Sequence, residues 1–152
     1  MSNSKGVTLI ELIVVVAIIG LLALLISGNT ATPMNKLTIE SAANMIAQDI
    51  RLTQQMALAK GDVCFFEINT RDNYYQIRSQ QSGTYKKESI DRSISISVNG
   101  FQDPYSGSSG DFKVLRYNPT GTPSTTGTIT LRKGDLVKQI TVMVGTGRVK
   151  IN

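Results

Sequence analysis

The hydrophobic and polar positions divide the 152-residue chain into three regions with different periodicities. From Val7 to Ile26 nearly every position is apolar, and only Thr8 and Glu11 are polar. At a rise of about 1.5 Å per residue, a helix of this length extends roughly 30 Å, which matches the hydrocarbon core of a bilayer. The run therefore predicts a transmembrane helix over residues 7–27.

The second region has the three- and four-residue spacing of an amphipathic helix. Its apolar and small positions are Ile39, Ala42, Ala43, Ile46, Ile50, Thr53 and Ala57. Gly28 and Pro33 disfavour an uninterrupted helix, so we expect a kink or a short non-helical stretch before the helix resumes near Lys36. Lys60-Gly61-Asp62 is typical of a helix C-terminus. Residues 28–61 are thus predicted to form a kink and an amphipathic helix whose apolar face packs on a sheet.

The third region consists of short segments with alternating apolar and polar residues, which is the pattern of β-strands. The predicted strands are 62–69, 73–79, 93–98, 112–118, 126–132, 138–144 and 147–152. Turn-forming residues separate them, and two polar loops, 99–111 and 118–127, are predicted to be exposed. The fold class is therefore α+β: a long N-terminal helix, half transmembrane and half amphipathic, packed on a C-terminal antiparallel β-sheet domain at residues 62–152.

Composition excludes most enzyme chemistry. The chain has no His, which removes the commonest general base and zinc ligand. The single Cys64 lies in a predicted strand, where a buried thiol is expected rather than a nucleophile. Asp103 and Asp111 flank a Gly/Ser loop, but their spacing fits no calcium loop and the loop lacks the Lys-Ser/Thr ending of a phosphate-binding loop. We expect no enzymatic activity, no metal and no cofactor.

The net charge of +5 is unevenly distributed. From residue 113 onward, Asp135 is the sole acidic residue. The basic residues there are Lys113, Arg116, Arg132, Lys133, Lys138, Arg148 and Lys150. This asymmetry suggests an anionic partner such as nucleic acid, a membrane or an acidic subunit, but a solvated sheet face that carries outward cations is the favoured explanation.

Glu11 distinguishes the apolar run from an ordinary membrane anchor. A carboxylate near the bilayer interior is costly and needs a partner or a purpose. A secretory signal peptide would have a shorter apolar run, although small residues suited to cleavage follow Ile26. A plain signal anchor explains the length but gives Glu11 no role. In a third interpretation, the chain is cut before the run, after Gly6.

The segment KGVTLIELIVVVAIIGLLALL, residues 5–25, resembles the class III signal of type IV pilins and type II secretion pseudopilins. The resemblance implies that residues 1–6 are a leader and that prepilin peptidase cleaves between Gly6 and Val7 and N-methylates Val7. Glu11 would be the glutamate of the family motif, whereas the family most often has Phe in place of Val7. It also implies a single-pass protein of the bacterial cytoplasmic membrane, with the leader in the cytoplasm and the C-terminal domain in the periplasm or outside the cell.

The resemblance gives Glu11 a physical role. Cleavage after Gly6 creates a cationic amine at Val7, about one helical turn from Glu11, and an amine–carboxylate pair satisfies both groups in the membrane. In a filament Glu11 can meet the amine of a neighbouring subunit, which favours the correct axial register. Glu11 is therefore predicted to be an assembly residue. The implied partners are prepilin peptidase, other pilins or pseudopilins and an inner-membrane assembly platform.

Two later segments, residues 51–77 and 116–151, are similar to the GspH/FimT family of minor pseudopilins. This similarity implies a structural subunit, in the tip or priming complex of a type IV pilus or a type II secretion pseudopilus. Members of the family implicated in DNA uptake carry a Gly-Arg-x-Arg motif near the C-terminus, and this chain has Gly147-Arg148-Val149-Lys150.

The alternative function is therefore a DNA-binding minor pilin. Arg148 and Lys150 would project from one face of a strand toward successive phosphates. Arg132 and Lys133 are adjacent in the chain, so only one of them can join that patch. The alternative without DNA binding is an exposed edge strand whose cations prevent aggregation with other strands.

Overall fold

The computed structural model describes residues 8–26, 31–104, 111–143 and 145–152. The chain divides into two compact units, Met1–Pro33 and Met34–Asn152. The first unit contains helix α1, Leu9–Ile26. The large apolar side chains described in this helix, from Leu9 to Leu22, are half or more exposed, between 78% at Leu9 and 50% at Val15. Among the described residues, no helix combines the length and hydropathy needed to cross a membrane. The predicted span 7–27 thus stays a prediction.

Helix α2, Ala31–Lys60, carries the predicted apolar face. Every position of that face is buried, and Ala47 beside it is fully buried. The helix ends as predicted, with Gly61 in the left-handed region at φ 61°. The expected start near Lys36 is wrong. Pro33 lies in the first turn of α2, where its missing N–H costs no hydrogen bond, and Gly28 lies outside the described residues.

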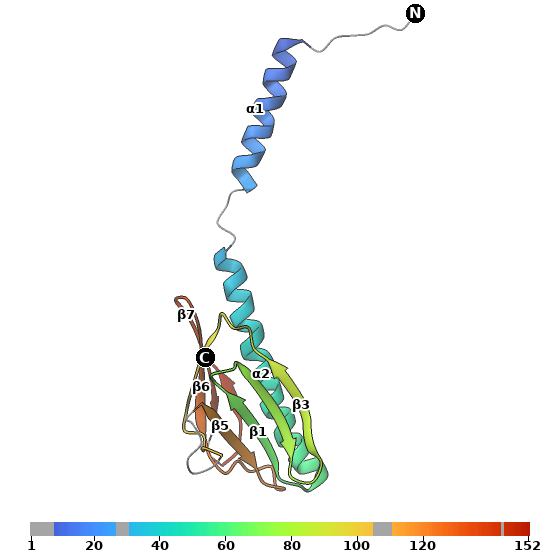
Figure 1. Ribbon diagram of the computed structural model, residues 1–152, viewed down its shortest axis with the longest axis vertical. Helices are drawn as coiled ribbons and strands as arrows, with labels where there is room; N and C mark the ends of the chain where they lie inside the picture. The colour runs from blue at the N-terminus through green and yellow to red at the C-terminus, as the bar shows by residue number, and fades with distance from the viewer. Residues whose placement is uncertain (1–7, 27–30, 105–110, 144) are drawn as a thin grey trace, which may run out of the picture. The chain divides into compact units, whose positions relative to one another are not determined.

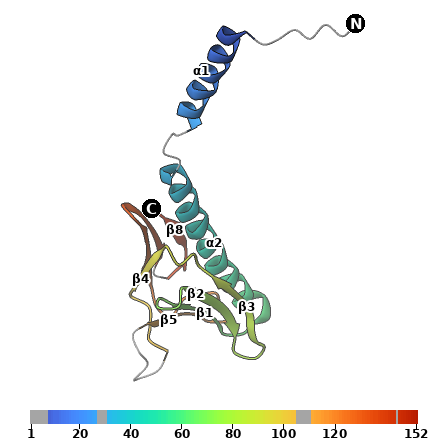
Figure 2. The same ribbon diagram turned by 45° about the horizontal axis from the view of Figure 1, so that its top comes forward.

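The remaining strands form two antiparallel four-stranded sheets. Sheet A has the order β3-β2-β1-β5, and sheet B has the order β4-β6-β7-β8. The strands of sheet A are β1 Cys64–Asn69, β2 Tyr74–Ser79, β3 Gly83–Ser89 and β5 Phe112–Tyr117. Those of sheet B are β4 Ser95–Asn99, β6 Gly127–Lys133, β7 Leu136–Val142 and β8 Val149–Ile151. Figures 1 and 2 show α2 running along the strands of this unit, with β3 beside it.

One hydrophobic core joins α2 to both sheets. Phe66 and Tyr75 of sheet A stack at a centroid distance of 5.1 Å, and Ile129 and Ile140 of sheet B are fully buried. Among the residues whose burial the structure describes, every buried hydrophobic one lies between Ile39 and Val149. The unit Met34–Asn152 therefore contains its own core, which is the condition for folding without α1.

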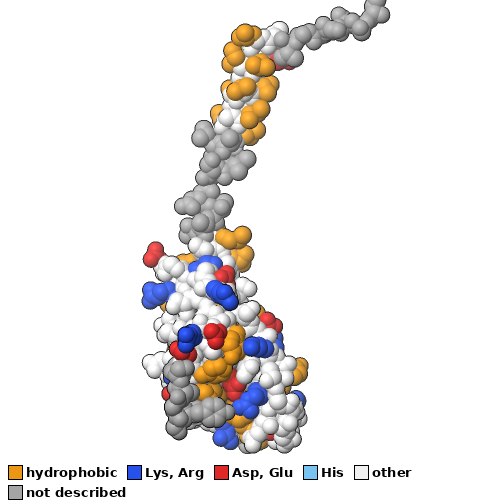
Figure 3. Space-filling model, in the orientation of Figure 1, with side chains coloured by type: hydrophobic (Ala, Val, Ile, Leu, Met, Phe, Trp, Pro, Cys, Tyr) orange, Lys and Arg blue, Asp and Glu red, His pale blue; other side chains and the backbone are white. Residues whose placement is uncertain are grey.

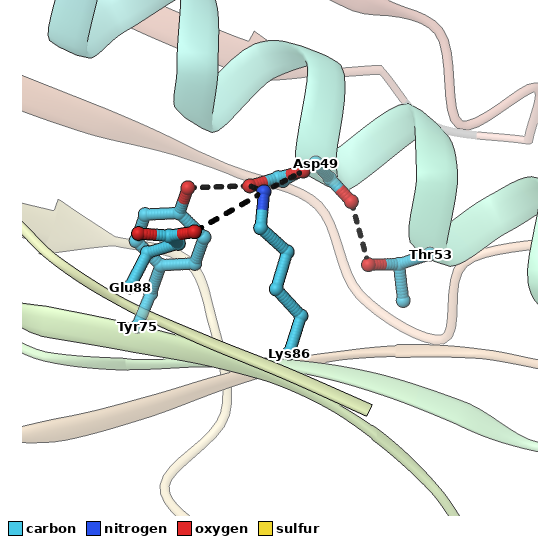
Figure 4. Close-up of polar contacts among 5 residues, drawn as sticks. All are labelled: Asp49, Thr53, Tyr75, Lys86 and Glu88. Atoms are coloured by element: carbon cyan, nitrogen blue, oxygen red, sulfur yellow. Dashed lines mark hydrogen bonds and ion pairs between the residues drawn. The ribbon is translucent and has the colours of Figure 1, made fainter. Parts of the chain in front are cut away.

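A buried carboxylate connects α2 to sheet A (Figure 4). Asp49, 5% exposed, accepts hydrogen bonds from the Tyr75 hydroxyl and from Lys86 Nζ, the latter at 2.8 and 3.0 Å. The carboxylate raises the pKa of Lys86, and burial together with Asp49 raises the pKa of Tyr75. The ion pair between Lys86 and Asp49 therefore attaches edge strand β3 to the helix.

Candidate functional site

Helix α1 begins immediately after Thr8, which acts as its N-cap. The Glu11 N–H donates to Thr8 Oγ1 at 3.4 Å and to the Thr8 carbonyl at 3.1 Å. Thr8-Leu9-Ile10-Glu11 matches the Ser/Thr-x-x-Glu capping box, which is a sequence signal for this helix start. Glu11 therefore lies in the first turn, where the helix dipole favours a carboxylate. Gly6 and Val7, the predicted cleavage residues, lie outside the described residues.

Beyond Glu11 the described side chains of α1 are apolar on all sides. A helix that is hydrophobic all round is stable only where lipid or other helices surround it. Glu11 is thus the one charged group among the described residues of α1, placed at its N-terminal end.

The C-terminal candidate residues lie on and beside β8. Arg148 and Lys150 are exposed, whereas Val149 between them is 6% exposed and packs in the core. Gly147 fixes the approach to this strand. It has φ 65°, and an added Cβ would lie 2.9 Å from Gln54 Nε2 and 3.0 Å from a ring carbon of Tyr117. Close packing thus explains the glycine at position 147, whereas Arg148 is exposed to solvent.

Arg51 of α2 joins this group of cations, and no local pattern in the sequence predicts that it does. Its guanidinium donates to the Val149 carbonyl at 3.1 Å, at the edge of β8 that faces away from β7. This places Arg51 beside the residue that separates Arg148 from Lys150. A contact between residues 98 positions apart leaves no local signal in the sequence.

The structure does not bring Arg132 and Lys133 into this group. Arg132 is exposed on the outer face of sheet B, the side turned away from α2, but it lies four residues along β6 and two strands from Lys150. Strand spacings put that separation at about 16 Å. Lys133 faces the opposite side and approaches Asp91 at 3.6 Å. The sequence allowed one of Arg132 and Lys133 to join Arg148 and Lys150. In the structure both lie away from this pair, and Arg51 lies beside it instead.

Neither Cys64 nor the acidic loop has the geometry of a reactive site. Cys64 is fully buried, and burial raises the pKa of its thiol. Asp103 forms an ion pair with Lys113 at 2.6 Å, and the Asp111 carbonyl accepts hydrogen bonds from Thr70. Within the part of the chain that the structure describes, no three His, Cys, Asp or Glu residues come together as metal ligands.

Solved structures share this arrangement of a helix packed on antiparallel sheets. The minor pseudopilin EpsH from the type 2 secretion system of Vibrio cholerae matches with a TM-score of 0.58 and 12% identity, over 76% of this chain and 96% of that one. The type IV minor pilin FimU of Pseudomonas aeruginosa matches with a TM-score of 0.60 and 13% identity, over 77% and 90%. The fold is therefore pilin-like, as predicted. The comparison with curated proteins finds no match.

Fold and N-terminus together define a pilin-like structural subunit. Residues 1–27 match the prokaryotic N-terminal methylation motif, and residues 42–147 match the type II transport protein GspH. The chain belongs to the GspH family. Proteins of this class are structural subunits, not enzymes, and they are membrane-anchored before assembly with other pilins into filaments.

Proposed function

We propose that this protein is a minor subunit in the tip or priming complex of a type II secretion pseudopilus or type IV pilus. The observation that carries the proposal is Glu11, held in the capped first turn of a helix that is otherwise apolar on all sides. Prepilin peptidase cleaves between Gly6 and Val7 and methylates the new amine. The chain is anchored in the bacterial cytoplasmic membrane by residues 7–27, with its N-terminus in the cytoplasm, and an inner-membrane platform assembles it.

In this proposal Glu11 sets the axial register of assembly. An unpaired carboxylate in an apolar medium is destabilised by the loss of hydration, and a nearby cationic amine offsets this free-energy cost. A neighbouring subunit offers such an amine at Val7 only when the two chains are staggered correctly. The Thr8 cap fixes the helix start, and thus the distance between the carboxylate and its own amine.

Mass spectrometry and a Glu11→Leu variant test the proposal. The mature chain should begin at Val7 with one added methyl group. Glu11→Leu should be cleaved and inserted like the wild type yet be depleted from sheared filaments. Glu40→Leu, which removes a partly exposed carboxylate from α2, serves as the matched control and should still assemble. An N-terminus other than Val7, or normal filament entry of Glu11→Leu, would contradict the proposal.

A second candidate function is DNA binding at β8. It is favoured by the cations Arg51, Arg148 and Lys150, which form no ion pair with any residue in the described ranges. Cations that neutralise phosphates release counterions, so each one should steepen the salt dependence of binding by about one unit on a log–log plot. Arg51, although bound to a backbone carbonyl, keeps its charge at the strand edge.

Mobility-shift titrations of the Met34–Asn152 unit with duplex DNA test this candidate. Arg148→Gln with Lys150→Gln should abolish the shift, and Arg51→Gln should weaken it. Arg132→Gln removes the same charge from the same sheet face at a distance and should leave binding unchanged. Equal losses in all variants would indicate a general charge effect, and unchanged binding in all of them would exclude the patch.

A further inference from the structure

The outer face of sheet A, turned away from α2, carries aromatic and basic side chains together. Its half-buried aromatic residues are Phe65, Tyr74 and Phe112, and its basic residues are Arg78, Lys87 and Arg116. We call these six residues the aromatic–basic face. Figure 3 shows a strip of hydrophobic side chains over the strands of this sheet, bordered by Lys and Arg.

The strand register interleaves these two kinds of residue. Phe65 on the central strand β1 lies between Arg78 on β2 and Arg116 on β5. The Arg78 guanidinium lies 4.4 Å from the centre of the Phe65 ring. Lys87 Nζ lies 4.1 Å from the centre of the Tyr74 ring. Cations therefore cover a ring face of both aromatic residues, an arrangement that is attractive in itself.

A buried carboxylate holds the face in one conformation. The Glu67 side chain, 9% exposed, lies at its centre and accepts two hydrogen bonds from Arg78 at 2.9 and 3.0 Å and one from Gln76 at 2.6 Å. Tyr74 meets Phe112 edge to face at 6.0 Å. Side chains that are already fixed lose little entropy on binding, so this surface is preorganised for a partner.

The charge of the face indicates an acidic partner. Glu67 neutralises Arg78, whereas Lys87 and Arg116 form no ion pair with any residue that the structure describes. Stacking of nucleobases needs open ring faces. The cations over Phe65 and Tyr74 occupy such faces, which favours a protein carboxylate over a nucleic acid. Fixed aromatic and Arg side chains are also the usual anchors of protein interfaces.

We propose that the aromatic–basic face docks a carboxylate-bearing surface of a neighbouring pilin-like subunit. The inference rests on the proposed function, because assembly with other pilins identifies the class of partner. Lys87 and Arg116 pair with the partner's carboxylates, while Phe65, Tyr74 and Phe112 supply the apolar contact. This surface shares no residue with the cations of β8 and does not include Glu11.

Site-specific photocrosslinking of the full-length chain in its own bacterium tests the docking. A photoreactive residue at Ser89 lies on the edge of sheet A, opposite Tyr74, and replaces none of the six residues of the aromatic–basic face. Ser97 is the matched control, since it is an exposed serine on the outer face of edge strand β4 in sheet B. Mass spectrometry identifies the crosslinked chain.

Crosslinking from Ser89 should capture a chain that has its own N-terminal methylation motif, and crosslinking from Ser97 should not. Lys87→Glu with Arg116→Glu should reduce the yield about tenfold, because charge reversal at a complementary interface repels the partner. Both residues are exposed, so circular dichroism of the double variant should match the wild type.

Several outcomes overturn the docking: no product, equal products from Ser89 and Ser97, a crosslink to nucleic acid, a protein without the motif, or insensitivity to the charge reversal. The N-terminal mass and the filament fraction of the same chain separate this failure from failure of the proposed function. A chain that starts at Val7 and enters filaments but gives no Ser89 product refutes the docking alone.

Discussion

The outer faces of the two sheets differ in composition although one helix covers the inner faces of both. The outer face of sheet A carries aromatic and charged side chains that contact one another. Glu67 lies at the centre of this face and is buried. The outer face of sheet B is mostly uncharged and polar, and its cations lie apart, Arg132 on β6 and Lys150 on β8. The other residues on this face are Ser95, Ser97, Asn99, Thr128, Thr130, Val137, Gln139 and Thr141. The inner faces of both sheets supply the hydrophobic core, so the core does not account for the aromatic and basic residues on the outer face of sheet A.

The ion pairs that connect α2 to the two sheets also differ, since the one toward sheet A is buried and the one toward sheet B is partly exposed. Toward sheet A the helix presents Asp49, which is buried between Tyr75 and Lys86. Toward sheet B it presents Glu40, whose side chain is 38% exposed and lies 3.8 Å from Lys138. A buried, hydrogen-bonded ion pair restricts the geometry far more than an exposed one. Sheet A is therefore the more rigidly attached surface.

The largest effect is expected from removing the helix carboxylate that faces sheet A. Asp49→Ala should lower the free energy of unfolding by about 3 kcal/mol, because it leaves the buried Tyr75 hydroxyl without its acceptor and leaves Lys86 with the longer contact to Glu88, at 3.7 Å. Glu40→Ala should lower it by about 0.5 kcal/mol or less. Urea unfolding of the Met34–Asn152 unit measures both. Equal losses would show that the two attachments do not differ.

A smaller effect is expected from two glycine substitutions in sheet B, one where the sheet contacts α2 and one in an open turn. Gly147→Ala should cost about 2 kcal/mol, since a Cβ at positive φ is strained and here also meets Gln54 and Tyr117. Gly134→Ala, at φ 58° with open space around it, should cost about 1 kcal/mol. Urea midpoints of the two variants give the difference. If they coincide, the contact of α2 with Gly147 does not hold this end of the sheet.

The sequence predicts the elements that follow a local period. The α2 face from Ile39 to Ala57 and seven of the eight strands follow from spacing alone. Strand β3 was missed because GTYKKES is a polar edge strand without alternation. Its place is set by pairing with β2 and by the Lys86–Asp49 contact, which are properties of the folded chain.

For the candidate functional residues too, the sequence predicts what a local motif determines and does not predict contacts between distant segments. Glu11 and the Thr8 cap follow from a four-residue motif, so they can be read from the sequence. The hydrogen bond from Arg51 to the Val149 carbonyl and the position of Arg78 over Phe65 depend on packing between segments that are distant in the sequence. Arg132 and Lys133 illustrate the limit: strand alternation separates their faces correctly, but the register that places Arg132 far from Lys150 is not local.

A third comparison contrasts one outward Arg from each sheet. Arg78→Ala removes two hydrogen bonds from the buried Glu67 and uncovers Phe65, and it should cost about 1 kcal/mol because Arg78 is itself 35% exposed. Arg132→Ala should change the free energy of unfolding by about 0.5 kcal/mol at most. Urea unfolding at pH 7 decides. A loss at Arg132 as large as that at Arg78 would mean that the outer face of sheet A is no better ordered than that of sheet B.

The smallest effect concerns pH and separates two carboxylates, one near each sheet. The Ser79 hydroxyl and the backbone N–H groups of Gln81 and Val63 lower the pKa of Asp62, and Ser93 together with Lys133 lowers the pKa of Asp91. A lowered folded-state pKa stabilises the fold above the unfolded value of about 3.9, and this stabilisation is lost as pH falls through the folded pKa.

Asp62→Asn and Asp91→Asn should thus be less stable than the wild type at pH 7, and both differences should narrow below about pH 4. Added salt should shrink the Asp91 difference further, because part of it is a charge pair with Lys133 at a side chain that is 48% exposed. The Asp62 difference should resist salt, since Ser79 of sheet A and backbone N–H groups provide it through hydrogen bonds. Urea midpoints across pH at low and high salt measure all four cases. A salt-sensitive Asp62 difference would assign it to surface charge and remove this distinction between the sheets.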